Sequence, residues 1–165
     1  MNYKHQAYIG IGSNVGNRVE NCLKAITAID ACEGCMVDAR SPLYETEPVE
    51  LETQDWFING VLKIRTCLQP ETLLARLQAI EQGMGREQGG LRFGPRIIDL
   101  DILFFDRRII ETDRLQIPHP RLHQRRFVLK PLCSIAPELV HPVLKKTASS
   151  LLKGLQDGEK KVNII

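Results

Sequence analysis

Apolar residues recur along the chain with two periods, and these periods predict its helices and strands. Apolar positions three to four residues apart predict helices at residues 17–31, after Pro70, at 127–135 and at 145–155. Short apolar or alternating runs predict strands at residues 7–12, 36–44, 57–66 and 97–105, and a short extended element at 109–110. Residues 45–54, which lack a period, and the glycine-rich residues 83–94 are expected to be loops.

The first six of these elements follow one another in the order βαββαβ. This order predicts a ferredoxin-like α+β fold, an antiparallel sheet with the helices packed on one of its faces. The second and third strands are expected to pair across the loop at 45–54. Ser13 or Asn14 is expected to cap the first helix. No linker or repeat divides the chain, so residues 1–165 are expected to form one domain.

The composition is typical of a globular protein, with 43% hydrophobic and 25% charged residues. No apolar run approaches the roughly 18 residues of a membrane span, and no signal-peptide pattern opens the chain. We therefore expect a cytoplasmic protein that has no membrane partner. A monomer is expected.

The five cysteines are an odd number in a chain without secretion features, so reduced thiols are expected. Cys32 and Cys35 form an isolated C-x-x-C pair, for which a redox or metal site is one interpretation. The pair follows a predicted helix, whereas a thioredoxin-type motif opens one, and no second pair or nearby histidine completes a zinc site. A turn from helix to strand is the favoured interpretation.

The segment Arg92-Phe-Gly-Pro-Arg96-Ile-Ile-Asp99-Leu-Asp101-Ile-Leu carries the densest candidate chemistry. On a strand, Asp99 and Asp101 project from one face. The opposite, core-facing side is expected to hold Ile98, Leu100, Ile102 and Phe104. Two neighbouring carboxylates repel each other unless a cation lies between them, and oxygen ligands favour Mg²⁺. A pair of surface aspartates is the alternative, but the adjacent arginines favour a metal site.

Arginines crowd the sequence on both sides of the two aspartates. They are Arg86, Arg92, Arg96, Arg107, Arg108, Arg114, Arg121, Arg125 and Arg126. A solvated basic face is the ordinary explanation of such a cluster. Arginine, however, binds phosphate with two parallel hydrogen bonds, which makes it a better phosphate ligand than lysine. Together with a metal site, the arginines predict chemistry on ATP.

Two further motifs accompany this segment, Gly10-Ile-Gly-Ser-Asn near the start and Pro118-His119-Pro120-Arg121 after the strand. With them, roughly residues 6–144 resemble the 6-hydroxymethyl-7,8-dihydropterin pyrophosphokinase family. The resemblance implies the ferredoxin-like fold and transfer of a diphosphate from ATP to the hydroxymethyl group of the pterin, with AMP leaving. It also implies two Mg²⁺ ions that accompany ATP and are held by Asp99 and Asp101. ATP and the pterin are thus the expected small-molecule partners.

The resemblance also implies roles for individual residues. The ATP-binding set is Gln78, Glu81, Arg86, Arg92, Arg96, Ile102, Arg114, His119 and Arg125. The catalytic set is Arg86, Arg92, Arg96, Asp99 and Asp101, with Arg86 and Arg92 on a moving loop. The pterin-binding set is Thr46, Val49, Phe57, Asn59, Asp99 and Phe127, with the two phenylalanines on either side of the ring. Without the resemblance, the phenylalanines would be expected in the core, and Gln78 and Glu81 on a helix surface.

His119 lies between two prolines, which hold it rigidly and exclude a helix there. It could be a general base, a phosphate ligand or a turn residue. Because an imidazole can donate a hydrogen bond to a phosphate oxygen, the phosphate role is favoured. Four positions, Gln88, Gly89, Phe93 and Pro120, depart from the residues that often occur in the family, so closure of the loop is expected to differ.

Three other functions remain as alternatives. An RNA-recognition module would carry exposed aromatic residues where this chain has aspartates. A nucleotidyltransferase or nuclease would also use paired carboxylates, but would need a long basic groove. A catalytically silent binding protein would not need Arg96, Asp99 and Asp101. We therefore expect no nucleic-acid partner.

Overall fold

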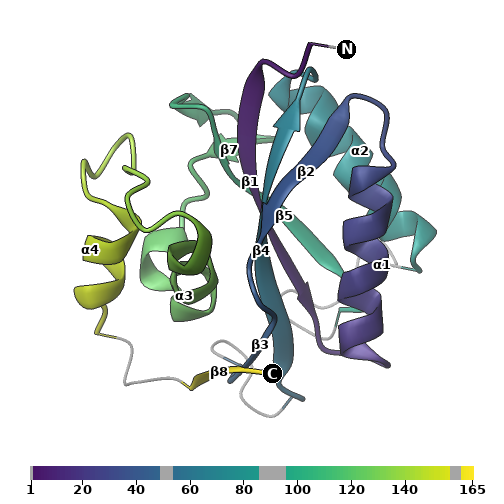
Figure 1. Cartoon of the computed structure of the whole chain (residues 1–165), viewed down its shortest axis with the longest axis vertical. Helices are drawn as coiled ribbons and strands as arrows, with labels where there is room; N and C mark the ends of the chain where they lie inside the picture. The colour runs from purple at the N-terminus through teal and green to yellow at the C-terminus, as the bar shows by residue number, and fades with distance from the viewer. Residues whose placement is uncertain (1, 49–53, 86–95, 157–160) are drawn as a thin grey trace.

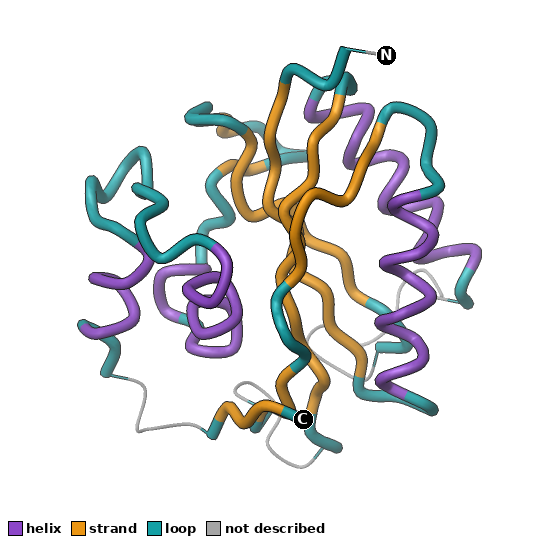
Figure 2. The backbone as a smooth tube through the Cα atoms, viewed as in Figure 1, coloured by secondary structure: helices purple, strands orange, loops and turns teal. Residues whose placement is uncertain are grey.

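Six antiparallel strands form the central sheet of the computed structural model, which describes residues 2–48, 54–85, 96–156 and 161–165 (Figure 1, Figure 2). The strands are β1 (His5–Ser13), β2 (Cys35–Arg40), β3 (Tyr44–Thr46), β4 (Phe57–Thr66), β5 (Asp99–Phe105) and β8 (Val162–Ile164). Their order is β5–β1–β4–β3–β8, and β2 pairs with β4 as well. The expected pairing of the second and third strands is thus confirmed as the pairing of β2 with β4.

Helices cover both faces of the sheet, with α1 and α2 on one side and α3 and α4 on the other (Figure 1). The helices are α1 (Arg18–Asp30), α2 (Pro70–Gly83), α3 (Arg126–Ile135) and α4 (Ala148–Lys153). Two short elements follow β5 in the chain and precede α3. They are the hairpin of β6 (Ile110–Glu111) and β7 (Gln116–Ile117) and the 3₁₀ helix Leu122–Gln124.

The two helices of the predicted βαββαβ unit, α1 and α2, share one face of the sheet, and α3 and α4, which follow this unit in the chain, lie on the opposite face. One core cluster contains Ile9 and Ile11 of β1 together with Ile29 of α1 and Leu77 of α2. The second cluster contains Val61 and Leu103 on the opposite face of the sheet, together with residues of α3 and α4. The burial pattern of β4 shows that both faces of the sheet are covered. Its residues 58–62 are all buried, whereas a strand with one exposed face would have only every second residue buried.

A β-bulge at Leu103 interrupts the alternation of β5. Tyr8 pairs with Phe104 but the next residue, Ile9, pairs with Ile102, so Leu103 is an extra residue in the ladder. As a result Phe104 packs with the α3 face and Phe105 packs with the α1 and α2 face. The prediction that Phe104 faces the same way as Leu100 and Ile102 is therefore wrong. The two aspartates precede the bulge and keep a common face.

Several element ends differ from the expected ones. Asn17, not Ser13 or Asn14, caps α1, and its side chain accepts a hydrogen bond from the backbone N–H of Glu20 at 3.2 Å. The predicted strand at 36–44 is divided into β2 and β3, and β3 extends into the predicted loop at 45–54. The expected start of α2 at Pro70 and the expected bounds of β4 are confirmed.

The C-x-x-C segment is a turn that joins α1 to β2. The backbone N–H of Cys35 donates to the carbonyl of Cys32 at 3.0 Å, as in a β-turn. All five cysteines are free. In the described part of the chain, no helix is both long and apolar enough to cross a membrane.

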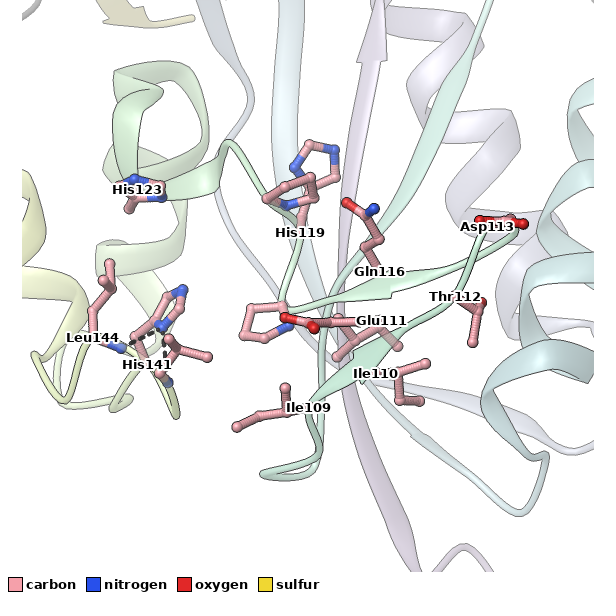
Figure 3. Close-up of a pocket in the computed structure, with 14 residues that line it drawn as sticks. Ile109, Ile110, Glu111, Thr112, Asp113, Gln116, His119, His123, His141 and Leu144 are labelled. Atoms are coloured by element: carbon pink, nitrogen blue, oxygen red, sulfur yellow. Dashed lines mark hydrogen bonds between the residues drawn. The ribbon is translucent and has the colours of Figure 1, made fainter.

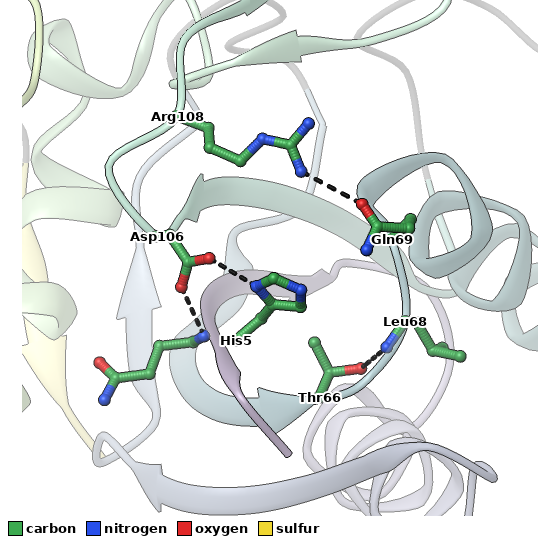
Figure 4. A network of polar contacts seen from close by, with 7 residues as sticks. His5, Thr66, Leu68, Gln69, Asp106 and Arg108 are labelled. Carbon is green, nitrogen blue, oxygen red and sulfur yellow. Dashed lines mark hydrogen bonds and ion pairs between the residues drawn. The ribbon is translucent and has the colours of Figure 1, made fainter. Parts of the chain in front are cut away.

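The start of β1 is tied to the end of β5 by a polar network (Figure 4). His5 Nδ1 lies 2.7 Å from Asp106 Oδ2, and the Gln6 N–H donates to Asp106 Oδ1 at 2.9 Å. The His5 ring packs on Phe105 at a centroid distance of 5.1 Å, and the Arg108 guanidinium lies 5.8 Å from the same ring centre. Phe105 therefore anchors this end of the sheet.

We predict that Phe105→Ala destabilises the protein by about 3–5 kcal/mol, since it empties a fully buried site. Urea unfolding at 25 °C measures the change. Ile109→Ala, at a position that is 54% exposed, is the control and should change the stability by no more than about 0.5 kcal/mol. Equal effects of the two substitutions would contradict the burial of Phe105 in the core.

Candidate active site

A row of four paired residues crosses the sheet. Tyr44 of β3 pairs with Asn59 of β4, Asn59 with Gly12 of β1, and Gly12 with Asp99 of β5. Paired residues on neighbouring strands face the same side, and strands lie about 4.8 Å apart. Asn59 and Asp99 therefore stand on the α3 face with a single glycine between them, at a Cα separation of about 10 Å.

Gly12 leaves the space that the Asn59 amide occupies. A Cβ atom at Gly12 would lie 2.5 Å from Asn59 Oδ1 and 3.7 Å from Phe57 Cδ1. On its other side, Asn59 Nδ2 donates to Thr46 Oγ1 at 2.5 Å, and both residues are buried. The structure thus brings together three residues of the predicted pterin set: Thr46, Phe57 and Asn59. Thr46 belongs to the end of β3, not to the predicted loop.

Asp99 and Asp101 are half-buried, and a helix fixes the strand segment between them. The backbone N–H of Leu100 donates to the carboxylate of Glu81 at 3.0 Å. Glu81 comes from α2 and is only 5% exposed. It therefore positions the part of β5 that carries both aspartates, while its predicted contact with ATP stays a prediction.

The two aspartates suit Mg²⁺ by donor type. Within the described residues, no group of three or more histidine, cysteine, aspartate or glutamate side chains is arranged to hold a metal ion. Mg²⁺ commonly uses one or two carboxylates and completes its shell with water and substrate phosphates. Asp99 and Asp101 therefore fit ions that bind together with a polyphosphate.

His119 lies after β7 and is oriented by the backbone. Its N–H donates to the Leu103 carbonyl at 3.0 Å, and its ring Nδ1 accepts from the Arg121 N–H at 3.2 Å. With Nδ1 acting as acceptor, the neutral ring carries its proton on Nε2. Burial, and next the charge of Arg125, lower the pKa of His119 to about 4, although Asp99 acts in the opposite direction.

This protonation state favours one of the three roles left open for His119. At neutral pH the ring is uncharged, and its Nε2–H can donate to a phosphate oxygen. A group with a pKa of about 4 is a weak base near pH 7. The phosphate role is therefore favoured over that of a general base.

Two predicted residues at the start of α3 contact each other. The Arg125 guanidinium lies 5.4 Å from the centre of the Phe127 ring, and both side chains are half-buried. Because Arg125 and Asp99 both act on the pKa of His119, these three side chains share one electrostatic environment. A residue predicted to bind ATP, Arg125, and a residue predicted to stack on the pterin, Phe127, therefore lie together at the start of α3.

A pocket of about 400 Å³ opens beside the β6–β7 hairpin, and His119 forms part of its lining (Figure 3).

The remaining predicted site residues lie in several different elements. Arg114 is exposed in the turn of the β6–β7 hairpin. Of the other predicted ATP residues, Gln78 is exposed on α2 and Ile102 is buried in the core. Arg96 is half-buried just before β5. Val49, Arg86 and Arg92 lie outside the described residues, as do Gln88, Gly89 and Phe93.

Asn14 links the two strands that carry the site, a role that the sequence did not reveal. It exchanges two hydrogen bonds with the backbone of Arg96, from its own N–H at 3.0 Å and to its Oδ1 at 2.7 Å. Its Nδ2 donates to Gln54 Oε1 at 2.7 Å and to the carbonyl of Asp55 at 3.3 Å. Asn14 lies in the Gly-Ile-Gly-Ser-Asn motif, but the sequence predicts only that Ser13 or Asn14 caps the first helix.

Arg18 is a second residue that was missed. It opens α1, and its guanidinium donates to the Trp56 carbonyl at 2.7 Å and to the Glu45 carboxylate at 3.0 Å. It thereby connects β3 to the residue that precedes β4. On a sequence basis it is an ordinary arginine in the first turn of an amphipathic helix.

We predict that the His119 ring stays neutral from about pH 5.5 to pH 8. Its pKa lies well below the ordinary value, so protonation should occur only as the pH falls towards about 4. The pH dependence of the His119 Cε1–H resonance measures this, with a His119→Gln variant to assign the signal. A midpoint near the ordinary value of 6.5 would contradict the burial and the charges described here.

Comparison with known proteins gives a consistent result. A family model described as 7,8-dihydro-6-hydroxymethylpterin-pyrophosphokinase matches residues 8–137. A 2-amino-4-hydroxy-6-hydroxymethyldihydropteridine pyrophosphokinase from Aquifex aeolicus is 40% identical over 139 residues, which cover 84% of this chain and 85% of that protein. A protein of the same name from Bacillus subtilis is 43% identical over 133 residues, or 81% of this chain and 79% of that protein.

Some relatives are much longer than this chain. The folic acid synthesis protein fol1 of Pneumocystis carinii is 45% identical over 91% of this chain, but the match covers only 20% of that protein. The chain thus spans about a fifth of the length of such relatives. The crystal structure of Plasmodium falciparum HPPK-DHPS A437G with STZ-DHP has a TM-score of 0.72 at 17% identity, over 90% of this chain and 45% of that chain, and so shares the fold. From the family match and the Aquifex and Bacillus relatives, we conclude that the chain belongs to the 7,8-dihydro-6-hydroxymethylpterin-pyrophosphokinase family.

Proposed function

We propose that this protein transfers a diphosphate from ATP to the hydroxymethyl group of 6-hydroxymethyl-7,8-dihydropterin, a step of folate biosynthesis. Membership of the family supports this reaction. The observation that carries it in the structure is the row of Asn59, Gly12 and Asp99, which sets an amide and a carboxylate on one face of the sheet with only a glycine between them. An aromatic ring with amide-like edges and a polyphosphate can meet across that row.

The pterin side of the proposed site is formed by β3, β4 and α3. The Asn59 amide offers a donor and an acceptor to the edge of the pterin, and Thr46 holds that amide in place. Phe57 and Phe127 are half-buried, so their ring faces can stack on a flat ligand. Val49 is part of the same proposal.

The phosphate side is formed by arginines and His119. Arg96, Arg114 and Arg125, together with Arg86 and Arg92, would bind the phosphates of ATP, and His119 would donate from Nε2. Asp99 and Asp101 would hold two Mg²⁺ ions, which would supply neutralisation of the phosphate charge and stabilisation of the charge on the attacking and leaving oxygens. The pterin hydroxymethyl oxygen attacks the β-phosphorus and loses its proton to solvent water, and the bond from the β-phosphorus to the α–β bridging oxygen breaks, so that AMP leaves.

We also propose a fold topology, a domain organisation, an oligomeric state and a cellular location for the protein. The order β5–β1–β4–β2 with antiparallel pairing supports a ferredoxin-like arrangement, to which β3 and β8 are additions. We assign residues 1–165 to one catalytic domain that acts as a monomer. The free cysteines are compatible with a reducing cytoplasm.

A metal-dependent nucleotidyltransferase or nuclease is the closest alternative, because paired carboxylates and arginines would serve it too. The buried amide of Asn59, set between Thr46 and Gly12, favours a small ligand with hydrogen-bonding edges. A polymer site would instead need a long groove of phosphate contacts.

The decisive experiment incubates the protein with ATP, Mg²⁺ and 6-hydroxymethyl-7,8-dihydropterin and separates the nucleotides by chromatography. We expect AMP that appears only when the pterin is present.

Asp101→Asn keeps the side-chain shape but removes the charge, and should lower AMP formation by at least about a hundredfold. Its circular dichroism and unfolding midpoint should stay close to those of the parent, since Asp101 is not in the core.

The products distinguish the alternatives. Pterin-dependent ADP would mean that a different phosphorus is attacked. Absence of any nucleotide product from folded protein would favour the polymer-acting alternative. Parental activity in Asp101→Asn would remove the metal role from that residue.

Gly12→Ala tests the pterin side of the site. The new Cβ would overlap Asn59 Oδ1, so the amide has to turn away, and pterin affinity should fall by about tenfold or more. Gly10→Ala in the same strand is the matched control, because the nearest neighbour of its Cβ would be the flexible Leu103 side chain at 3.4 Å. Titration of the pterin fluorescence measures both. Equal affinities in the two variants would contradict the proposed place of the pterin.

A further inference from the structure

The chain ends in a strand that lies against β3, beyond the residues that the family model matches. β8 pairs antiparallel with β3, with Val162 opposite Thr46 and Ile164 opposite Tyr44. Figure 1 shows β8 beside β3 at the C-terminus. The family match ends at residue 137, and the sequence alone suggests no role for this tail.

Backbone hydrogen bonds attach both ends of β3 to the tail. The Glu47 N–H donates to the Lys161 carbonyl at 3.0 Å, and the Ile165 N–H donates to the Leu43 carbonyl at 3.2 Å. The Lys161 N–H donates to the Glu47 carboxylate at 3.1 Å. Hydrogen-bonded pairs alternate along antiparallel strands, so the register directs the Asn163 N–H towards Glu45, midway between these two ends.

The short strand β3 depends on such support. It has three residues, and its other side pairs with β4, so without β8 it would be the outer strand at this end of the sheet. A short outer strand opens locally at a low free-energy cost. Thr46, the last residue of β3, accepts the hydrogen bond from Asn59. A displacement of β3 would therefore release the Asn59 amide.

β8 adds little to the core. Asn163 is exposed, and Ile164 and Ile165 are 65% and 56% exposed. Among the described residues, neither core cluster includes a member of β8. β8 also contacts α3, the helix that carries Phe127. It thus adjoins two elements of the pterin side, and its removal should disturb them without unfolding the protein.

We propose that β8 is a positioning element of the pterin site, which holds β3 so that Thr46 orients the Asn59 amide. The inference rests on the proposed role of Asn59 in pterin binding. The effect should be selective. Pterin affinity should depend on β8 and ATP affinity should not, because none of the proposed ATP residues in the described part of the chain belongs to β3, β4 or β8.

The test compares Asn163→Pro with Asn163→Ala in the full chain, and adds a variant that ends at residue 160. Proline removes the N–H that faces Glu45, whereas alanine removes only an exposed side chain. The dissociation constants of the pterin and of a non-hydrolysable ATP analogue are measured with Mg²⁺, together with the unfolding midpoint. We expect the pterin constant to rise about tenfold in the proline and truncated proteins, and every other constant to stay within about twofold of the parent value.

Parental pterin affinity in the truncated protein would overturn the proposal. So would an equal loss of pterin and ATP affinity, because that result indicates general destabilisation. A full-length parent protein that does not bind the pterin would instead overturn the proposed function. The two failures are therefore distinct.

Discussion

The antiparallel pairing of β1 with β4 and with β5 determines where the candidate site residues on the sheet lie. Side chains alternate between the two faces, so a slip of one residue in either ladder would carry Asn59 or Asp99 to the opposite face. The apolar half of the same strands specifies the register, since Ile9, Ile11 and Leu100 are buried under α1 and α2. Buried apolar area contributes about 25 cal/mol per Å², so a slip that exposes these side chains costs several kcal/mol. The geometry of the site is therefore a consequence of the core on the other side of the sheet.

Polar side chains that bind backbone groups then hold the site segments in place. Asn14 bonds to the backbone of Arg96, Arg18 to the carbonyl before β4, and Glu81 to the N–H between the two aspartates. Each contact joins segments that are distant in the sequence, so the geometry exists before any ligand binds. The same packing of segments also determines the protonation state of His119. Burial, and next the nearby arginines, lower the pKa of His119 and keep its ring neutral, so the positive charge lies on the guanidinium groups and the imidazole offers one hydrogen-bond donor.

Strong local patterns predicted the elements that place the site, and non-local contacts account for what was missed. The bounds of β4 and the start of α2 at Pro70 follow from periodic runs that end at turn-forming residues. The bulge at Leu103 leaves the composition of β5 unchanged, so its effect on Phe104 could not be seen in the sequence. The space that Gly12 leaves for Asn59 depends on the register of two strands nearly fifty residues apart. The second layer of helices covers a face of β4 that would otherwise be exposed, since residues on both faces of this strand are buried. The local sequence of β4 predicts a strand but does not show that both of its faces are covered.

The two halves of the proposed site are supported by different parts of the chain. The strand that carries Asp99 and Asp101 is fixed by Glu81 and by β1, and Glu81 and the β1 residues that pair beside the two aspartates are within the residues that the family model matches. Thr46 instead belongs to a strand that lies between β4 and β8, and β8 is outside that match. Because the backbone hydrogen bonds of β8 with β3 and its flanking residues involve no residue of β5, a change in the tail can alter the pterin side and leave the carboxylates in place. On the proposed assignment, chains that share the same metal and phosphate residues can therefore differ in pterin affinity through a segment that carries none of them.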